Sequence, residues 1–312
     1  MSTAHASEYA WHQALLYTGD QQYVNGVLNF ADSALSTDRP LFVAVPAAHG
    51  ALLRRHLDGR AERVRFADMT DLGRNPSRII PAIRQFIDAH PEPVSFVGEP
   101  IWPGRTPAEV AEATRHEALI NAAFDGTGAR VLCPYDVSEL DPAVVADAHR
   151  THPELIGADG RTQASARYSD PHVVWQDTAH LPLVPAHAEH LRIGPRDLAD
   201  VRHLARRAAA RAGLPTSRAD DLILAVTELA TNSVLHGGGG ATVTVWPDAG
   251  RVLCEVSDSG ALTDPLAGRR RPAEDAVDGR GLWLVNQLCD LVQLHSSATE
   301  TRVRITVAGH TG

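Results

Sequence analysis

Glu228, Asn232 and His236 stand four residues apart in a segment whose apolar residues recur at helical spacing. A step of four residues offsets successive side chains on an α-helix by only about 40°, so the three share one narrow stripe. A carboxylate, an amide and an imidazole that point the same way can serve a site for a metal ion and a phosphate group. The alternative is an ordinary solvated face, which is the commoner situation on an isolated helix.

Two glycine-containing segments downstream could complete such a site. Asp258 and Gly260 end a predicted strand, where a carboxylate can accept a hydrogen bond from an exocyclic amine and glycine lets a flat base approach. Gly279 and Gly281 open an apolar helix, where backbone N–H groups and the helix dipole favour an anion. The spacing of a phosphate-binding loop, Gly-x-x-x-x-Gly-Lys-Ser/Thr, does not occur. The four glycines at 237–240 are therefore expected to end a helix and form a hinge.

The elements that must position these residues form the C-terminal half of the chain. An apolar stripe predicts a helix over 220–236, preceded by an Arg- and Ala-rich helix over 195–212 whose arginines are expected to be solvated. Alternation of period two over 241–246 and 252–256, around a turn at 247–250, predicts an antiparallel hairpin. The polar stripe and the glycine segments therefore lie on helices and strand ends of one domain.

The N-terminal half has a different pattern. It predicts strands over 41–45, 94–97 and 130–133 and helices over 51–57, 81–89 and 106–124. Strands that alternate with helices of this size indicate βαβ units around a largely parallel sheet. The proline-punctuated segment 169–190 is expected to be a linker. The expected domains therefore span 8–168 and 191–308.

Composition limits the possible functions. The chain has 312 residues, of which 44% are hydrophobic and 21% charged, values typical of a folded protein of about two domains. A net charge of −9 gives no basic footprint, so direct nucleic-acid binding is not expected. The three cysteines form no Cys-x-x-Cys pair and the sixteen histidines no His-x-x-x-His pair, so most histidines are expected to bind no metal. Without a long apolar run, a cytoplasmic protein with no membrane contact is expected.

Taken in order, the C-terminal segments resemble the GHKL ATPases, the group that includes gyrase, Hsp90-type chaperones, histidine kinases and anti-sigma factor serine kinases. Residues 228–236 resemble the N box, 258–260 the first glycine box and 279–285 the second, and Thr301 matches the threonine that opens the last strand. The resemblance covers roughly 191–307. It implies a Bergerat α/β sandwich of helices on a mixed sheet that binds ATP and Mg²⁺, with Asn232 as the Mg²⁺ ligand. The residues it implies for nucleotide binding are Asn232, His236, Asp258, Gly260, Gly279, Arg280, Gly281 and Thr301.

The Glu-x-x-x-Asn-x-x-x-His form of the N box is most similar to that of the anti-sigma factor serine kinases of the RsbW type. This resemblance implies a regulator that sequesters a sigma factor, or phosphorylates a serine or threonine of an anti-sigma factor antagonist, with Glu228 as general base. Two alternatives remain open: a nucleotide-dependent binding switch without phosphotransfer, and a histidine kinase with His203 as phosphoacceptor. The segment 261–278 between the glycine boxes, with arginines at 269–271, is expected to be a lid over the phosphates.

The first 160 or so residues resemble the MEDS domain, a sensory module found fused to this type of ATPase. The resemblance rests on residues 12–17, 98–102, 117–124, 132–136 and 151–153. It implies a RecA-like α/β fold without a phosphate-binding loop, responding to a small-molecule signal or supplying a homodimer surface.

A ligand pocket in this domain is expected around Glu99, Glu117 and Cys133. Glu99 and Cys133 come at the ends of predicted strands, where α/β sheets bind ligands. Each residue has a plainer interpretation as well. Cys133 can be a small buried hydrophobe, and His152, before Pro153, can simply fix a turn.

Overall fold

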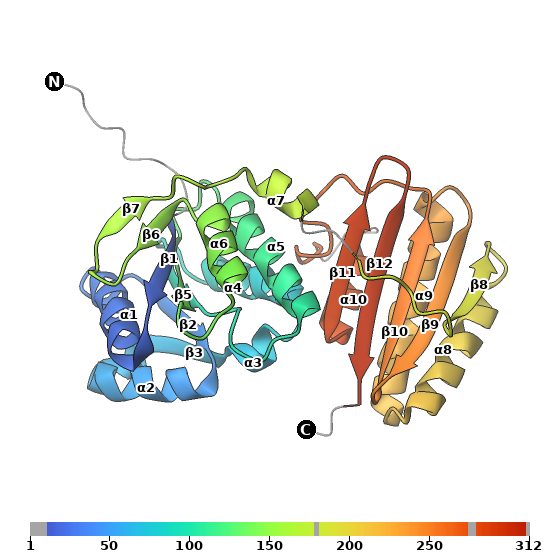
Figure 1. The fold of residues 1–312 in the computed structure, drawn as a ribbon, viewed down its shortest axis with the longest axis horizontal. Coiled ribbons are helices and arrows are strands. Elements are labelled where there is room, and N and C mark those ends of the chain that lie inside the picture. Colours follow the sequence, from blue (N-terminus) through green and yellow to red (C-terminus); the bar gives the residue numbers. More distant parts are fainter. Residues whose placement is uncertain (1–10, 178–180, 274–278, 310–312) are drawn as a thin grey trace. The chain divides into compact units, whose positions relative to one another are not determined.

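The computed structural model describes residues 11–177, 181–273 and 279–309 (Figure 1). Its chain divides between Trp175 and Gln176 into two units, and each has its own hydrophobic core. The expected linker, 169–190, contains the helix α7 (Pro171–Asp177) and the first residues of β8 (Glu189–Ile193). Residues 178–180 of that linker, and residues 8–10 of the expected first domain, lie outside the described residues.

The first unit is built on a seven-stranded sheet of order β3-β2-β4-β5-β1-β6-β7. Its strands are β1 (Trp11–Tyr17), β2 (Leu41–Val45), β3 (Val64–Asp68), β4 (Ser95–Gly98), β5 (Arg130–Asp136), β6 (Glu154–Ile156) and β7 (Thr162–Ala164). All strand pairs are parallel except β6 with β7. The expected α/β fold with a largely parallel sheet is therefore confirmed. The strand β1, which lies between β5 and β6, was not predicted as a strand.

Helices cover both faces of this sheet. They are α1 (Gly19–Leu35), α2 (Ala47–Leu57), α3 (Met69–Leu72), α4 (Ile79–Asp88), α5 (Pro107–Ala123) and α6 (Pro142–Thr151), with short 3₁₀ helices at Asp58–Arg63 and Pro76–Arg78. Alternate side chains of β2 point to opposite faces of the sheet. Leu41, Val43 and Val45 share a core with α1 and α2, whereas the ring of Phe42 packs against Phe86 of α4.

The connection between β1 and α1 bears on nucleotide binding. β1 ends at Tyr17 and α1 begins at Gly19, so Thr18 alone separates them. A phosphate-binding loop needs a run of several glycine-rich residues between strand and helix, with a lysine at the helix start. The first turn of α1 instead carries the acidic residue Asp20. The connection between β1 and α1 is therefore not a phosphate-binding loop.

The second unit is a five-stranded sheet of order β11-β12-β10-β9-β8 with helices on one face. The remaining strands are β9 (Ala241–Asp248), β10 (Arg251–Asp258), β11 (Leu291–Ser296) and β12 (Thr301–Ala308), and the helices are α8 (Leu198–Ala212), α9 (Thr216–His236) and α10 (Arg280–Leu288). The expected sandwich is confirmed, but every described strand pair is antiparallel where a mixed sheet was expected. Short turns join β9 to β10 and β11 to β12, and short turns require antiparallel neighbours.

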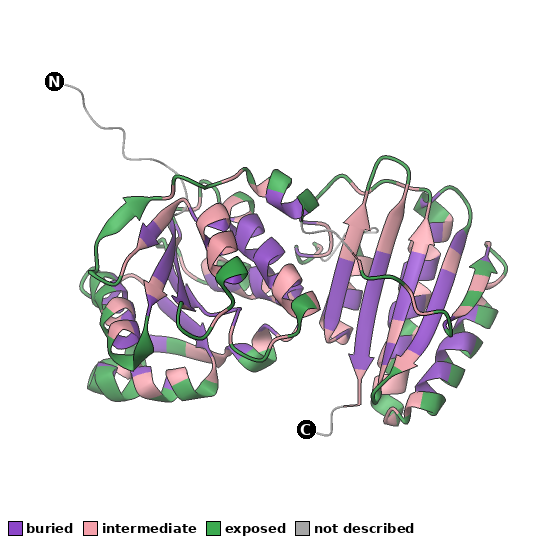
Figure 2. Cartoon of the chain, viewed as in Figure 1, coloured by how far each residue is buried: buried purple, intermediate pink, exposed green. Residues whose placement is uncertain are grey.

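The middle of β12 is buried on both faces of this second sheet (Figure 2). Val303, Ile305 and Val307 of β12 pack into the core beneath the helices. Arg304 points to the opposite face, where it pairs with Glu255 of β10 at 2.6 Å and donates to the carbonyl of Pro182 at 2.7 Å. The segment before β8 therefore crosses this face, as Figure 1 shows. No helix in the described parts of the chain is long and apolar enough to cross a bilayer.

Candidate functional site

A pocket of about 480 Å³ lies in the second unit, between α9, the ends of β10 and β12, and the start of α10. Leu229, Val256 and Leu294 form an apolar part of the pocket wall. The wall is polar where the helix α9 faces α10. Most of the residues singled out in the sequence line it, namely Asn232, His236, Asp258, Gly260, Gly279, Gly281 and Thr301. Segments far apart in the sequence thus meet at one cavity.

Asp258, the last residue of β10, is held firmly at the base of this pocket. Ser233 of α9 donates its hydroxyl to one carboxylate oxygen at 2.6 Å, and the backbone N–H of Gly260 donates to the other at 2.8 Å. Gly237 allows this approach, because a Cβ at that position would lie 2.4 Å from the Asp258 carboxyl carbon. Thr301 in turn donates to the carbonyl of Gly260 at 2.9 Å. The carboxylate is therefore pre-oriented toward the cavity.

Glu228 and Asn232 lie together beside the start of α10. A Cβ on Gly281 would be 2.8 Å from the Asn232 amide nitrogen and 3.0 Å from a Glu228 carboxylate oxygen. Gly279, which precedes the helix, has a φ of 84°, a conformation that favours glycine. An amide and a carboxylate therefore face the N-terminal end of a helix, the arrangement predicted for Mg²⁺ and phosphate.

Three of the predicted residues occupy more peripheral positions. Glu228 is half-buried but is not among the described residues that line the pocket. His236 is exposed at the end of α9, where it reaches the pocket wall. Arg280 is exposed at the first position of α10 and lines an adjoining pocket with Arg271 and Trp283.

The described part of the expected lid is anchored to α10. Asn286 donates its side-chain amide to the carbonyl of Gly268 at 3.0 Å. Of the three lid arginines, Arg269 is buried, while Arg270 is exposed and pairs with Asp264 at 3.2 Å. Residues 274–278 of the expected lid lie outside the described residues. The prediction of lid closure stays a prediction.

Sequence reasoning missed the two hydroxyl groups that complete this site. Ser233 follows Asn232 directly on α9 and lines the same cavity. Ser296, at the end of β11, bonds both the Thr301 hydroxyl at 3.0 Å and the N–H of Leu262 at 2.7 Å. The strand β11 itself was not predicted, so no sequence signal placed Ser296 near the site.

In the first unit the expected pocket around Glu99, Glu117 and Cys133 is wrong as a single site. Glu99 follows β4 and binds His49 at 2.8 Å and the hydroxyl of Tyr23 at 3.4 Å. Glu117 lies on α5, and Cys133 lies within β5 on the face that α5 covers. Of the three residues, Glu99 therefore lies at the carboxyl edge of the sheet, whereas Glu117 and Cys133 belong to a separate buried group.

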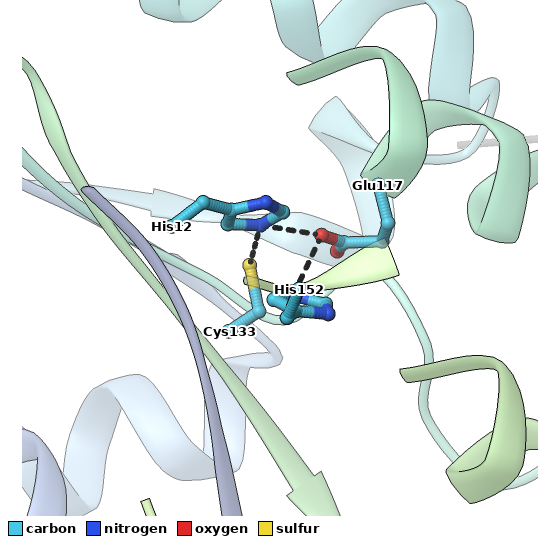
Figure 3. A group of neighbouring side chains, drawn as sticks. All are labelled: His12, Glu117, Cys133 and His152. Atoms are coloured by element: carbon cyan, nitrogen blue, oxygen red, sulfur yellow. Dashed lines mark hydrogen bonds and ion pairs between the residues drawn. The ribbon is translucent and has the colours of Figure 1, made fainter. Parts of the chain in front are cut away.

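That separate group also contains two histidines (Figure 3). One ligand atom from each of His12, Glu117, Cys133 and His152 lies within 4.8 Å of the others. His12 Nε2 is 3.0 Å from the Glu117 carboxylate and 3.4 Å from the Cys133 sulfur, and His152 Nε2 is 3.2 Å from the same carboxylate. All four side chains are buried. His152 thus has more than the turn-forming role that its sequence position suggested.

Burial dominates the ionisation of this group. It lowers the pKa of His12 to about 4, helped by the neighbouring His152. It also raises the pKa of the Cys133 thiol well above its usual range, with the Glu117 charge acting in the same direction. In the Glu99 group, by contrast, the hydrogen bond that His49 donates to Glu99 raises the pKa of His49, while burial raises the pKa of Glu99 itself.

The antiparallel sandwich and its pocket define the second unit as an ATPase domain of the GHKL type, preceded by a RecA-like α/β unit. Comparison with known families agrees. The MEDS family, described as the methanogen/methylotroph, DcmR sensory domain, matches residues 11–153, and the histidine kinase-like ATPase domain matches residues 192–307. One family model thus matches most of the first unit, and the other matches most of the second unit.

Two solved structures resemble parts of this chain at low sequence identity. The RsbU and RsbW domains of Rv1364c from Mycobacterium tuberculosis share 21% identity over 40% of this chain and 33% of that chain, with a TM-score of 0.31. The histidine kinase AdeS from Acinetobacter baumannii shares 11% identity over 39% of this chain and 68% of that chain, with a TM-score of 0.25. The match thus spans a third of the length of the first structure. No curated protein matches the chain significantly.

Proposed function

We propose that the chain is a signal-responsive anti-sigma regulatory factor. In this proposal the C-terminal unit binds Mg·ATP and either phosphorylates a serine or threonine of an anti-sigma factor antagonist or sequesters a sigma factor, and the N-terminal unit receives the signal. The observation that carries the proposal is the arrangement at the pocket. Glu228 and Asn232 face the N-terminal end of α10 on one side, and a pre-oriented Asp258 lies on the other.

The residues present fit a nucleotide with Mg²⁺. The carboxylate of Asp258 offers an acceptor for an exocyclic amine, and the apolar wall formed by Val256, Leu229 and Leu294 suits a flat base. The Asn232 amide oxygen is a hard ligand of the kind that Mg²⁺ shares with phosphate oxygens. Gly281 keeps the space beside this amide free of a side chain. When bound, ATP would supply a transferable phosphoryl group.

Glu228 is proposed as the general base. Its carboxylate lies beside Asn232 and Gly281, next to where the phosphates would lie, and it is half-buried. A carboxylate so placed can accept the proton of a serine or threonine hydroxyl from a partner protein as that oxygen attacks phosphorus. The bond between the γ-phosphorus and the bridging oxygen would break, and ADP would leave with that oxygen. The proton would then reside on Glu228 Oε1 or Oε2, and the phosphate ester would reside on the partner.

The direct test uses ATP labelled at the γ-phosphate with candidate antagonist proteins. We expect acid-stable, alkali-labile phosphoserine or phosphothreonine on the antagonist. Glu228→Gln should bind Mg·ATP like the parent and lose transfer by at least 100-fold, because general-base catalysis typically contributes about 10²–10⁴-fold. Asp258→Asn should lose nucleotide binding in calorimetry, whereas Asp248→Asn, a change on the exposed hairpin, should not.

The two alternatives give different results in the same experiment. A binding switch would show nucleotide-dependent affinity for a partner and no label on any protein. A histidine kinase would show acid-labile label on the chain itself. His203 is exposed on α8, the helix that packs against α9, so in that role the phosphoacceptor would lie on a helix of the ATPase fold itself. Equal transfer rates for Glu228→Gln and the parent would contradict the general-base role.

A further inference from the structure

The four buried side chains of His12, Glu117, Cys133 and His152 come from four different places in the first unit. His12 comes from β1, Glu117 from α5, Cys133 from β5 and His152 from the residue that follows α6. Each points into the space between the sheet and α5 (Figure 3). We propose that these four side chains form a zinc-binding site.

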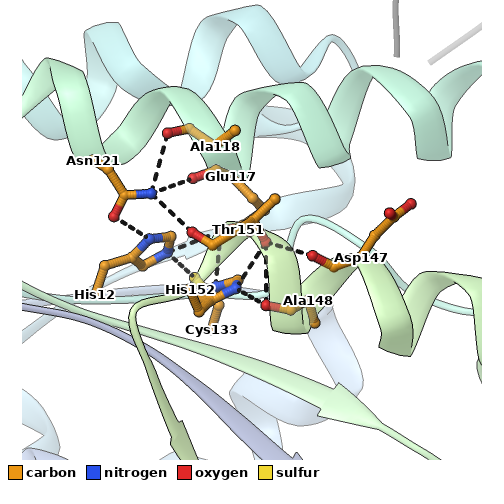
Figure 4. A network of polar contacts seen from close by, with 9 residues as sticks. All are labelled: His12, Glu117, Ala118, Asn121, Cys133, Asp147, Ala148, Thr151 and His152. Carbon is orange, nitrogen blue, oxygen red and sulfur yellow. Dashed lines mark hydrogen bonds and ion pairs between the residues drawn. The ribbon is translucent and has the colours of Figure 1, made fainter. Parts of the chain in front are cut away.

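Hydrogen bonds around the cluster fix the tautomers of both histidines (Figure 4). Asn121 donates its amide N–H groups to the carbonyls of Thr151 and Ala118, at 2.8 and 3.1 Å, so its oxygen must face His12 Nδ1 at 3.1 Å. His152 Nδ1 lies 2.9 Å from the carbonyl of Ala148. Both Nδ1 atoms therefore carry a hydrogen, and both Nε2 atoms present a lone pair to the centre of the cluster.

That orientation has an electrostatic consequence. Glu117 directs one carboxylate oxygen at both Nε2 atoms, and its other oxygen is buried without a hydrogen-bond partner among the described residues. Two lone pairs and a carboxylate facing one another repel, and burial removes the water that would separate them. A cation placed between them converts this repulsion into coordination. Histidines bonded through Nδ1 to a carbonyl or amide oxygen are the usual supporting arrangement around a metal.

The donor set and its dimensions favour zinc. Two imidazole nitrogens, one thiolate and one carboxylate are the mixture of ligands that Zn²⁺ takes, whereas Mg²⁺ and Ca²⁺ prefer oxygen alone. Zinc–ligand distances of about 2.0–2.3 Å give tetrahedral edges of about 3.3–3.7 Å. Three of the six separations, those of His12 from Glu117 and Cys133 and of His152 from Glu117, are 3.0, 3.4 and 3.2 Å, close to these values. All six are within 4.8 Å, so small side-chain shifts would close the set around one ion. Four protein ligands leave no open position, so the site binds the metal without exposing it to substrate.

The test is metal analysis of the full-length protein. Protein produced with zinc in the medium and dialysed should retain about one zinc per chain. Replacement by Co²⁺ should give intense tetrahedral d–d bands together with a thiolate-to-cobalt charge-transfer band. Cys133→Ser should remove the charge-transfer band while metal still binds. Cys254→Ser and Cys289→Ser, which change buried cysteines of the other unit, are the matched controls and should leave both bands unchanged.

A second variant tests the contribution of the residue that orients His12 without removing any metal ligand. Asn121→Ala keeps all four ligands but removes the group that orients His12, and loss of such a supporting contact typically weakens metal affinity about 10–100-fold. Competition with a chromophoric chelator measures that shift, and circular dichroism of each variant checks its fold. Less than a tenth of a zinc per chain, or a parent cobalt spectrum without the thiolate band, would overturn the proposal. The parent spectrum decides this even where a variant does not fold.

Discussion

At Gly281 the absence of a side chain leaves room beside Asn232 and Glu228. A methyl group there would lie 2.8 Å from the Asn232 amide and 3.0 Å from the Glu228 carboxylate, closer than Cβ atoms are normally found. We expect Gly281→Ala to leave α10 folded, since alanine is the better helix former, and to lower affinity for Mg·ATP by at least tenfold. Calorimetry measures the affinity. Gly59→Ala, whose Cβ would meet nothing within 4 Å, is the control that should bind normally.

His49 should titrate above its ordinary pKa of 6.5, because its hydrogen bond with Glu99 favours the protonated ring. A raised pKa in the folded state means that this pair contributes stability below pH 6.5 and that the contribution is lost as the pH rises through the folded-state pKa. An NMR titration of the imidazole signals measures the pKa. Glu99→Gln should lower it toward 6.5, and an unchanged value would contradict the pairing.

The two sites differ in how far the sequence predicted them. Glu228, Asn232 and His236 share one helix face, so a local spacing sufficed to group them. Asp258 could be added because the order of the boxes resembled a known family. His12 and Cys133, by contrast, are 121 residues apart, and only strand register brings them together. Neither spacing nor composition carries that information.

At the level of elements, the ion pair of Glu255 and Arg304 joins neighbouring strands on the sheet face opposite the helices. Both side chains are buried, and Arg304 also donates to Pro182 and lies over the Trp246 ring. Glu255→Leu should therefore lower the free energy of unfolding by about 3–5 kcal/mol, because it leaves a buried guanidinium without its counter-charge. Urea denaturation of the truncated chain 176–312 measures this.

A double variant provides the control for that prediction. Replacing both charges, as in Glu255→Leu with Arg304→Met, removes the uncompensated charge and should restore most of the stability. If the single and double variants were equally destabilised, packing rather than charge pairing would hold this face together.

Elements were predicted best where the pattern was local. The strand predicted over 41–45 from a continuous apolar run is β2. The helix predicted over 106–124 is α5, and the structure shows that a capping box of Thr106 and Glu109 begins it. The strand β1 was not predicted because it is buried within the sheet and yet contains the polar residues His12 and Gln13. Polar residues interrupt the apolar run by which a buried strand is recognised in a sequence. The polar residues there belong to the cluster and to a bond with Glu154.

On the scale of the whole molecule, the two separate cores predict two separate unfolding transitions in calorimetry. Mg·ATP should raise the temperature of the transition that the truncated chain 176–312 also shows, because a ligand stabilises the unit that binds it. A strong zinc chelator should lower the other transition. A single transition that moves with both treatments would show instead that the units unfold as one.

The place of β1 between β5 and β6 determines when the first unit can form during synthesis. Of the described strands β1 is made first, but its partners β5 and β6 begin only at residues 130 and 154, and the pairings join positions more than a hundred residues apart. Such distant contacts make folding slow, since a long loop must close before they stabilise anything. Nascent chains that stop near residue 125 should therefore stay protease-sensitive, and protection should appear abruptly once β6, which ends at residue 156, has emerged.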